Sequence, residues 1–230
     1  MTSTLFTAKM KMADLILANH NLVLILPRFG IELGFGEKSI EEVCATHQVS
    51  LPFFLTVCNI YAYDDYFPTP EQITFNNLQG MLPYLAASHH HYLRERIPHI
   101  EHHLQKIAES CAPRQGAILM RFFTEYKDEV AKHFNYEEEV VFPYIEGLWA
   151  GKDVDNYVIH QYKETHSNVE EKLEDLTNII IKYLPSNVLP NEKASVLFDI
   201  FRLATDLNKH ELIEEKVLIP YVISIEKHGV

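Results

Sequence analysis

The chain has 230 residues, and its 32 acidic against 20 basic side chains give a formal net charge of −12. Such a negatively charged surface repels phosphate backbones and anionic lipid, so nucleic acids and membranes are not expected as partners. Three scattered cysteines without a CxxC motif argue against a disulfide framework and favour a cytoplasmic location. The early apolar stretch over residues 15–26 is too short and too polar to span a bilayer, and we expect no signal peptide.

Short helices are expected in the first part of the chain. Apolar residues over 13–26 precede Pro27, which predicts one helix and its end. The sequence Ser39-Ile40-Glu41-Glu42 has the spacing of a capping box and predicts the start of another helix. A further apolar run extends over 51–61. These segments predict a small helical N-terminal domain over residues 1–66.

Longer helices are expected in the rest of the chain. The segment 64–70 combines two acidic residues with two prolines, which is typical of a linker. A second domain is therefore predicted over residues 72–230. Its four long helical patterns extend over about 82–108, 115–149, 154–183 and 190–225. Because the connections between them are short, they predict an all-α fold, an antiparallel four-helix bundle.

One motif occurs twice in this second domain. The pattern HxxxEExVxxPY begins at His133 and begins again at His210. Each copy places a glutamate four residues after its histidine, at Glu137 and at Glu214. Residues four apart on a helix point the same way, so each pair can bind one metal ion. The repeat predicts two helical hairpins that each contribute such a pair.

The remaining two helices would add one histidine each. His90 and His166 repeat at nearly the same separation as the two motifs. If the two glutamates bridge, two metal ions lie between them, and this mixture of nitrogen and oxygen ligands suits iron, manganese or zinc. The predicted metal ligands are His90, His133, Glu137, His166, His210 and Glu214.

A repeated hydrophobic core alone would not explain the motif. A single HxxxE is expected by chance in a chain with thirteen histidines, but a repeated twelve-residue pattern is not. A core repeat also requires no histidine or glutamate at buried positions. Burying such groups without a metal would cost several kcal/mol. The repeat therefore favours a metal site.

The choice of histidine on the first long helix has an alternative. His89, His90 and His91 are consecutive, so their side chains point in three directions. His90 shares a heptad seam with Ala86 and Leu93, whereas His89 is the alternate ligand and His91 is expected to point away. Three further histidines on the same helix lie off the seam and are expected at the surface: His99, His102 and His103.

These motifs resemble the hemerythrin-like HHE cation-binding domain, in its repair-of-iron-centres branch. The resemblance rests on the two HxxxE motifs, on His89 to Pro98 and on Glu164-Thr165-His166, and it covers nearly the whole chain. That branch also carries a small helical N-terminal domain, which residues 28–31 and 40–44 resemble. The implied fold is a hemerythrin-like antiparallel four-helix bundle preceded by this domain.

The resemblance also implies a cofactor and a role. The cofactor would be two iron ions in a non-haem di-iron centre, with an oxo-bridged form expected. Four histidines would be terminal ligands, and Glu137 and Glu214 would be carboxylate bridges. The implied role is the restoration of iron–sulfur clusters damaged by nitric oxide or oxidants in the cytoplasm, with damaged iron–sulfur proteins as partners and a homodimer as one expected assembly.

Two positions depart from the family pattern. The family commonly has a Cys-Cys pair where this chain reads Gly34-Phe35, so thiol chemistry assigned to that pair is absent. The family often has a histidine where Cys111 stands. On a straight helix Cys111 would lie about 31 Å from His90, so it is left out of the predicted ligand set.

Three functions fit these observations, and the sequence does not separate them. The first is an iron-donating repair protein active in the response to nitrosative or oxidative stress. The second is a di-iron protein that binds or senses oxygen or nitric oxide without repair activity. The third is an oxidoreductase acting on nitric oxide or peroxide. The missing Cys-Cys pair favours the second slightly over the others.

Overall fold

The computed structural model describes residues 5–152, 159, 162, 169–186 and 188–228. These residues are helical apart from turns, loops and a single β-bridge between Lys11 and Ser39, which confirms the all-α prediction. In this described part of the chain, no helix is both long enough and apolar enough to cross a membrane. Contacts divide the chain into two compact units, Met1–Ser88 with Leu148–Lys152 and Lys209–Val230, and His89–Gly147 with Asp153–Asn208.

The first unit begins with short helices, as the sequence predicts. Ser39 forms the predicted capping box, because its Oγ accepts from the Glu42 amide while Glu42 Oε2 accepts from the Ser39 amide. The apolar run over 13–26 is not one helix, since Asn19 leaves the helical conformation and its side chain accepts from Asn21. The elements are α1 (Met12–Ala18), the 3₁₀ turns η1 (His20–Leu24) and η2 (Pro27–Phe29), α2 (Ile40–Thr46), α3 (Leu51–Ala62) and α4 (Met81–His91). The last three residues of α4, His89 to His91, belong to the second unit.

The same unit includes the C-terminal helices η6 (Glu214–Leu218) and α11 (Ile219–His228). Lys209 Nζ donates to the Ile60 carbonyl at 3.1 Å and to Asp64 Oδ1 at 2.6 Å. Lys216 Nζ donates to the Asp64 carbonyl at 2.8 Å and to the Tyr66 carbonyl at 3.2 Å. The segment predicted as a linker therefore contacts the C-terminal part of the chain. Both lie in the first unit, and the boundary between the units falls at Ser88 instead.

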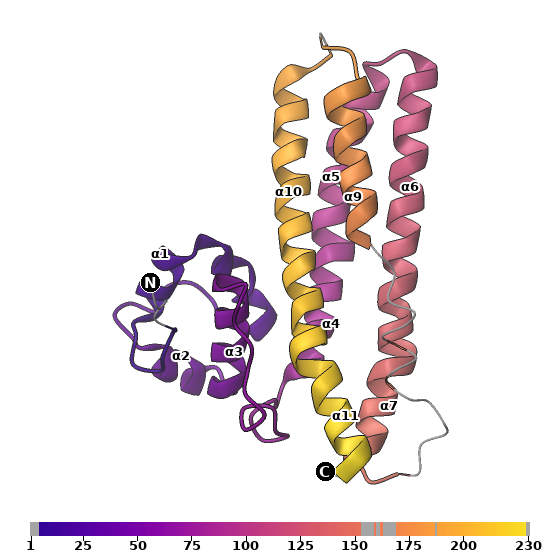
Figure 1. Ribbon diagram of the computed structural model, residues 1–230. Helices are drawn as coiled ribbons and strands as arrows, with labels where there is room; N and C mark the ends of the chain where they lie inside the picture. Colours follow the sequence, from indigo (N-terminus) through magenta and orange to yellow (C-terminus); the bar gives the residue numbers. More distant parts are fainter. Residues whose placement is uncertain (1–4, 153–158, 160–161, 163–168, 187, 229–230) are drawn as a thin grey trace. The chain divides into compact units, whose positions relative to one another are not determined.

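The second unit is a bundle in which α5, α6, α9 and α10 lie side by side (Figure 1). Its core collects apolar residues at helical spacing from all four, among them Ile100, Leu104, Phe123, Leu176 and Ile200. The elements are η3 (Tyr92–Arg96), α5 (Ile97–Glu109), α6 (Pro113–Tyr136), η4 (Glu137–Val141), α7 (Phe142–Trp149), α9 (Val169–Asn178), η5 (Ile179–Tyr183) and α10 (Pro190–Ile213). The last two residues of α7 and the last five of α10 belong to the first unit.

Three helices continue through an Xaa-Pro pair by way of a π-helical turn directly before it, whereas a fourth such turn, Ile179–Tyr183, ends its helix before Leu184-Pro185. Proline has no N–H, and its ring clashes with the carbonyl four residues earlier, so the regular α-helix cannot continue unchanged. The amide before each proline instead donates to the carbonyl five residues back, in the pairs Ile97 to Tyr92, Phe142 to Glu137 and Ile219 to Glu214. Each such turn adds one residue and shifts the helix face accordingly. Two of the three turns begin at the glutamate of an HxxxE motif.

The contact between α5 and α6 depends on a glycine. Gly116 is buried near the start of α6, and a Cβ at this position would meet the Ala108 carbonyl oxygen at 2.4 Å. Because that obstacle is backbone, Gly116→Ala must push the two helices apart, at a cost of about 1–3 kcal/mol in the free energy of unfolding. Urea unfolding should show this loss. Gln115→Ala, one residue earlier on the same helix, should be neutral or slightly stabilising, and equal stability of the two variants would contradict the close approach.

Candidate metal centre

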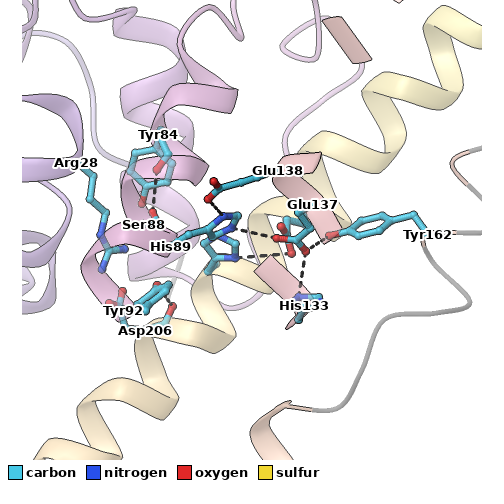
Figure 2. A network of polar contacts seen from close by, with 12 residues as sticks. Arg28, Tyr84, Ser88, His89, Tyr92, His133, Glu137, Glu138, Tyr162 and Asp206 are labelled. Atoms are coloured by element: carbon cyan, nitrogen blue, oxygen red, sulfur yellow. Dashed lines mark hydrogen bonds and ion pairs between the residues drawn. The ribbon is translucent and has the colours of Figure 1, made fainter. Parts of the chain in front are cut away.

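His89 is the buried histidine of α4 (Figure 2). Its Nε2 lies 3.0 Å from Glu137 Oε2, and its Nδ1 lies 2.8 Å from Glu138 Oε1. The ring stacks on Phe134 with the two centroids 4.1 Å apart. Glu138 can accept the Nδ1 proton, so that Nε2 is available to a metal ion bound together with Glu137. This is the arrangement in which a carboxylate orients a metal-binding imidazole.

Glu137 is the centre of this polar network and is only 1% exposed. Its Oε1 lies 3.0 Å from His133 Nε2 and accepts a hydrogen bond from Tyr162 Oη at 2.5 Å. Burial alone would raise the pKa of the Glu137 carboxyl, but hydrogen bonds and charge from His133 and His89 hold this pKa well below its usual value of 4.5. Glu137 is thus a buried carboxylate whose negative charge is compensated by two imidazoles.

The structure does not bring His90 to Glu137. The side chain of His90 is exposed, whereas His89 is buried. The heptad seam holds from Ile97 onward, but the π-helical turn over Tyr92–Arg96 shifts the face before it by one residue. Leu85 and His89 before the turn and Tyr92 at its start are accordingly buried, at the places where the regular seam predicts Ala86, His90 and Leu93. His91 contacts Glu95 instead, with its Nδ1 3.1 Å from Glu95 Oε2.

The second HxxxE motif belongs to the other unit. His210 and Glu214 are 3% and 0% exposed, and His210 Nδ1 lies 3.7 Å from Glu214 Oε2. The two side chains of each predicted His/Glu pair are therefore adjacent, and all four are buried except His133, whose side chain is 11% exposed. His166 lies outside the described residues.

Sequence reasoning missed two groups that contact the site. Tyr162 donates to Glu137, and Glu138 accepts from His89. Tyr162 stands four residues before His166, and that helical spacing could have indicated a hydroxyl directed at the same place. Glu138 gives no such signal, because it follows Glu137 directly and its side chain is 46% exposed.

These donor groups fit a transition-metal ion. Two imidazoles converge on one buried carboxylate, a combination of nitrogen and oxygen ligands that iron, manganese and zinc accept. The lowered pKa of Glu137 favours the ionised carboxylate, which is the form that binds a cation. The residues around them supply the outer contacts that fix the ligands in place.

The family model of the Hemerythrin HHE cation binding domain matches residues 84–222, more than half of the chain. This chain therefore belongs to the hemerythrin HHE cation-binding family, and it is a metal-binding protein of that class. The match includes both HxxxE motifs and His89.

Among curated proteins, the chain is similar to the iron-sulfur cluster repair protein ScdA of Staphylococcus haemolyticus, with 21% identity over 84% of this chain and 89% of that protein. It is also similar to ScdA of Staphylococcus epidermidis, with 22% identity over 64% of this chain and 68% of that protein. No solved structure matches the chain significantly.

The first-helix ligand can be identified by substitution. His89→Ala removes a buried imidazole that faces Glu137 and should lower the metal bound per chain, with metal loss beginning at higher pH because fewer imidazoles compete with protons. His90→Ala and His91→Ala should retain the wild-type amount. Metal content after dialysis across a pH series measures this. Metal loss in His90→Ala with retention in His89→Ala would contradict the assignment.

The Tyr162 hydroxyl should tune the site without being a ligand. Tyr162→Phe removes the donor to Glu137 Oε1 and should weaken metal binding by roughly tenfold while leaving the number of ions at saturation unchanged. Tyr92→Phe is the matched control, because it removes a buried hydroxyl that donates to the Asp206 carbonyl instead. Competition with a chelator measures both affinities, and equal affinities in the two variants would contradict the role of Tyr162.

Proposed function

We propose that this chain is a non-haem di-iron protein that takes part in the repair of iron–sulfur clusters. The observation that carries the proposal is the buried Glu137 carboxylate between His89 and His133, in a motif that the chain repeats at His210 and Glu214. The name of the ScdA relatives, iron-sulfur cluster repair protein, supports the role. Damaged iron–sulfur proteins in the cytoplasm, under nitrosative or oxidative stress, are the proposed partners.

The proposed ligand set differs from the sequence prediction at one position. His89 replaces His90 because it is buried against Glu137. Glu137 and Glu214 are the proposed bridges between two iron ions, and His166 is included on the sequence repeat alone. The proposed terminal ligands are His89, His133, His166 and His210.

The surrounding residues would prepare these ligands for the metal. Glu138 holds the Nδ1 proton of His89, so that Nε2 is available. Tyr162 and the stacked Phe134 hold Glu137 and His89 in position. Iron bound by such ligands supplies redox chemistry and coordination positions for small molecules.

A second candidate is a protein that binds or senses oxygen or nitric oxide without repairing clusters. The observation that favours it concerns the thiols. Burial raises the pKa of Cys44 to about 12 and the pKa of Cys58 well above its ordinary value. Burial also raises the pKa of Cys111. Since the thiolate is the reactive form, none of the three cysteines suits a thiol-dependent repair step.

Removing both proposed bridges tests the iron centre and the repair role together. Wild-type protein purified without added metal should contain about two irons per chain, and Glu137→Ala/Glu214→Ala should contain less than about half of that. Wild type should also restore activity to a [4Fe–4S] enzyme damaged by peroxide or nitric oxide, and the double variant should not. Iron analysis and the recovery of enzyme activity measure the two effects.

The matched control is Glu139→Ala/Glu215→Ala, which removes two exposed carboxylates next to the proposed bridges. It should retain both iron and repair. Wild-type protein that holds two irons and binds nitric oxide, yet restores no cluster, would exclude repair and support sensing. Unchanged iron content in Glu137→Ala/Glu214→Ala would contradict the di-iron proposal itself.

A further inference from the structure

A second group of metal-ligand side chains lies away from the HHE motifs, between α5 and α10 within the bundle unit. His99 and His103 stand four apart on α5, so their imidazoles share one face, and their ring centroids are 4.8 Å apart. Asp199 on α10 lies beside them, with its Oδ2 3.3 Å from His99 Nε2. One ligand atom from each of these three side chains can be chosen so that all three lie within 4.8 Å of one another.

We propose that His99, His103 and Asp199 form a second site for a divalent transition-metal ion, with Zn²⁺ as the ion it suits. Two imidazoles and one carboxylate are a ligand set that zinc accepts, with metal–ligand distances of about 2.0–2.2 Å. The present separations require only side-chain adjustments to reach that geometry. The site is independent of the proposed iron centre, since it shares no ligand with it.

The neighbours of the three side chains leave suitable ligand atoms available. Arg96 lies 3.1 Å from Asp199 Oδ1, which fixes the carboxylate and directs Oδ2 toward His99. Glu192 Oε2 lies 2.7 Å from His103 Nδ1, so it can accept the Nδ1 proton and leave the Nε2 lone pair to a metal. Carboxylates contact the remote nitrogen of metal-binding histidines in this way. Arg96 and Glu192 are thus positioning residues.

The accessibility of the group suits an ion that exchanges with solution. The His99 side chain is 48% exposed, whereas the side chains of His103 and Asp199 are 17% and 13% exposed. A zinc ion could therefore enter past His99 and bind to two less exposed ligands. Because the ligands come from α5 and α10, the ion would connect two helices of the bundle and bind the folded state only.

Zinc binding to the untagged full-length protein, as purified, tests the site. Equilibrium dialysis against ZnCl₂ should give about one more zinc per wild-type chain than per His99→Ala/His103→Ala chain. Asp199→Asn should show the same loss, which covers the case in which the histidine variant folds poorly. Glu192→Gln should keep the number of ions but bind zinc roughly tenfold more weakly. Zinc should raise the unfolding temperature of wild type and not of His99→Ala/His103→Ala.

The matched control is His20→Ala/His47→Ala, which removes two exposed imidazoles from the other unit and should bind as much zinc as wild type. Iron content should be the same in every variant, so that a failed iron centre and a failed zinc site are distinguishable. Wild-type zinc binding in both His99→Ala/His103→Ala and Asp199→Asn would overturn the proposal. An equal loss in the control would overturn it as well, because zinc would then bind exposed histidines indiscriminately. Unchanged affinity in Glu192→Gln would overturn the role given to Glu192.

Discussion

The buried charge of Glu137 is the constraint on which the rest of the site depends. A carboxylate taken out of water is tolerated only if other groups compensate its charge and fill its hydrogen-bonding positions. His89 comes from one helix and His133 from another, while the Tyr162 hydroxyl supplies a neutral donor. The same pairing that satisfies this charge without a metal also gathers ligands at one point, so the folded chain presents a partly organised binding site.

Much of this arrangement follows from the sequence because it depends on local spacing. HxxxE places two side chains on one helix face whatever the tertiary structure, and the two members of each pair are indeed adjacent. The all-α fold follows for a similar reason, since heptad spacing and scarce glycine favour long helices. The capping box at Ser39 is an equally local signal, and it forms as predicted.

The choice between His89 and His90 could not be read in the same way. A regular α-helix that extends back from Ile97 places His90 on the buried face. The π-helical turn before Pro98 adds one residue between Ile97 and the histidines. The buried histidine is therefore His89, one residue earlier in the chain than His90. Pro98 is visible in the sequence, but proline can kink or end a helix as well as induce a π turn. Tyr162 and Glu138 depend on contacts between helices, which spacing alone does not define.

The attachment of Lys209 and Lys216 to residues 60–66 has a practical consequence for the purified protein. The two ammonium groups flank the second HxxxE motif, one residue before His210 and two residues after Glu214. Their acceptors are Ile60, Asp64 and Tyr66. Asp64, Asp65 and Phe67 are exposed and lie outside the helices, in the kind of chain that proteases cut. A cut there would release the segment that holds the acceptors of two largely buried ammonium groups beside proposed ligands. Intact mass is therefore as necessary a measure of sample quality as metal content.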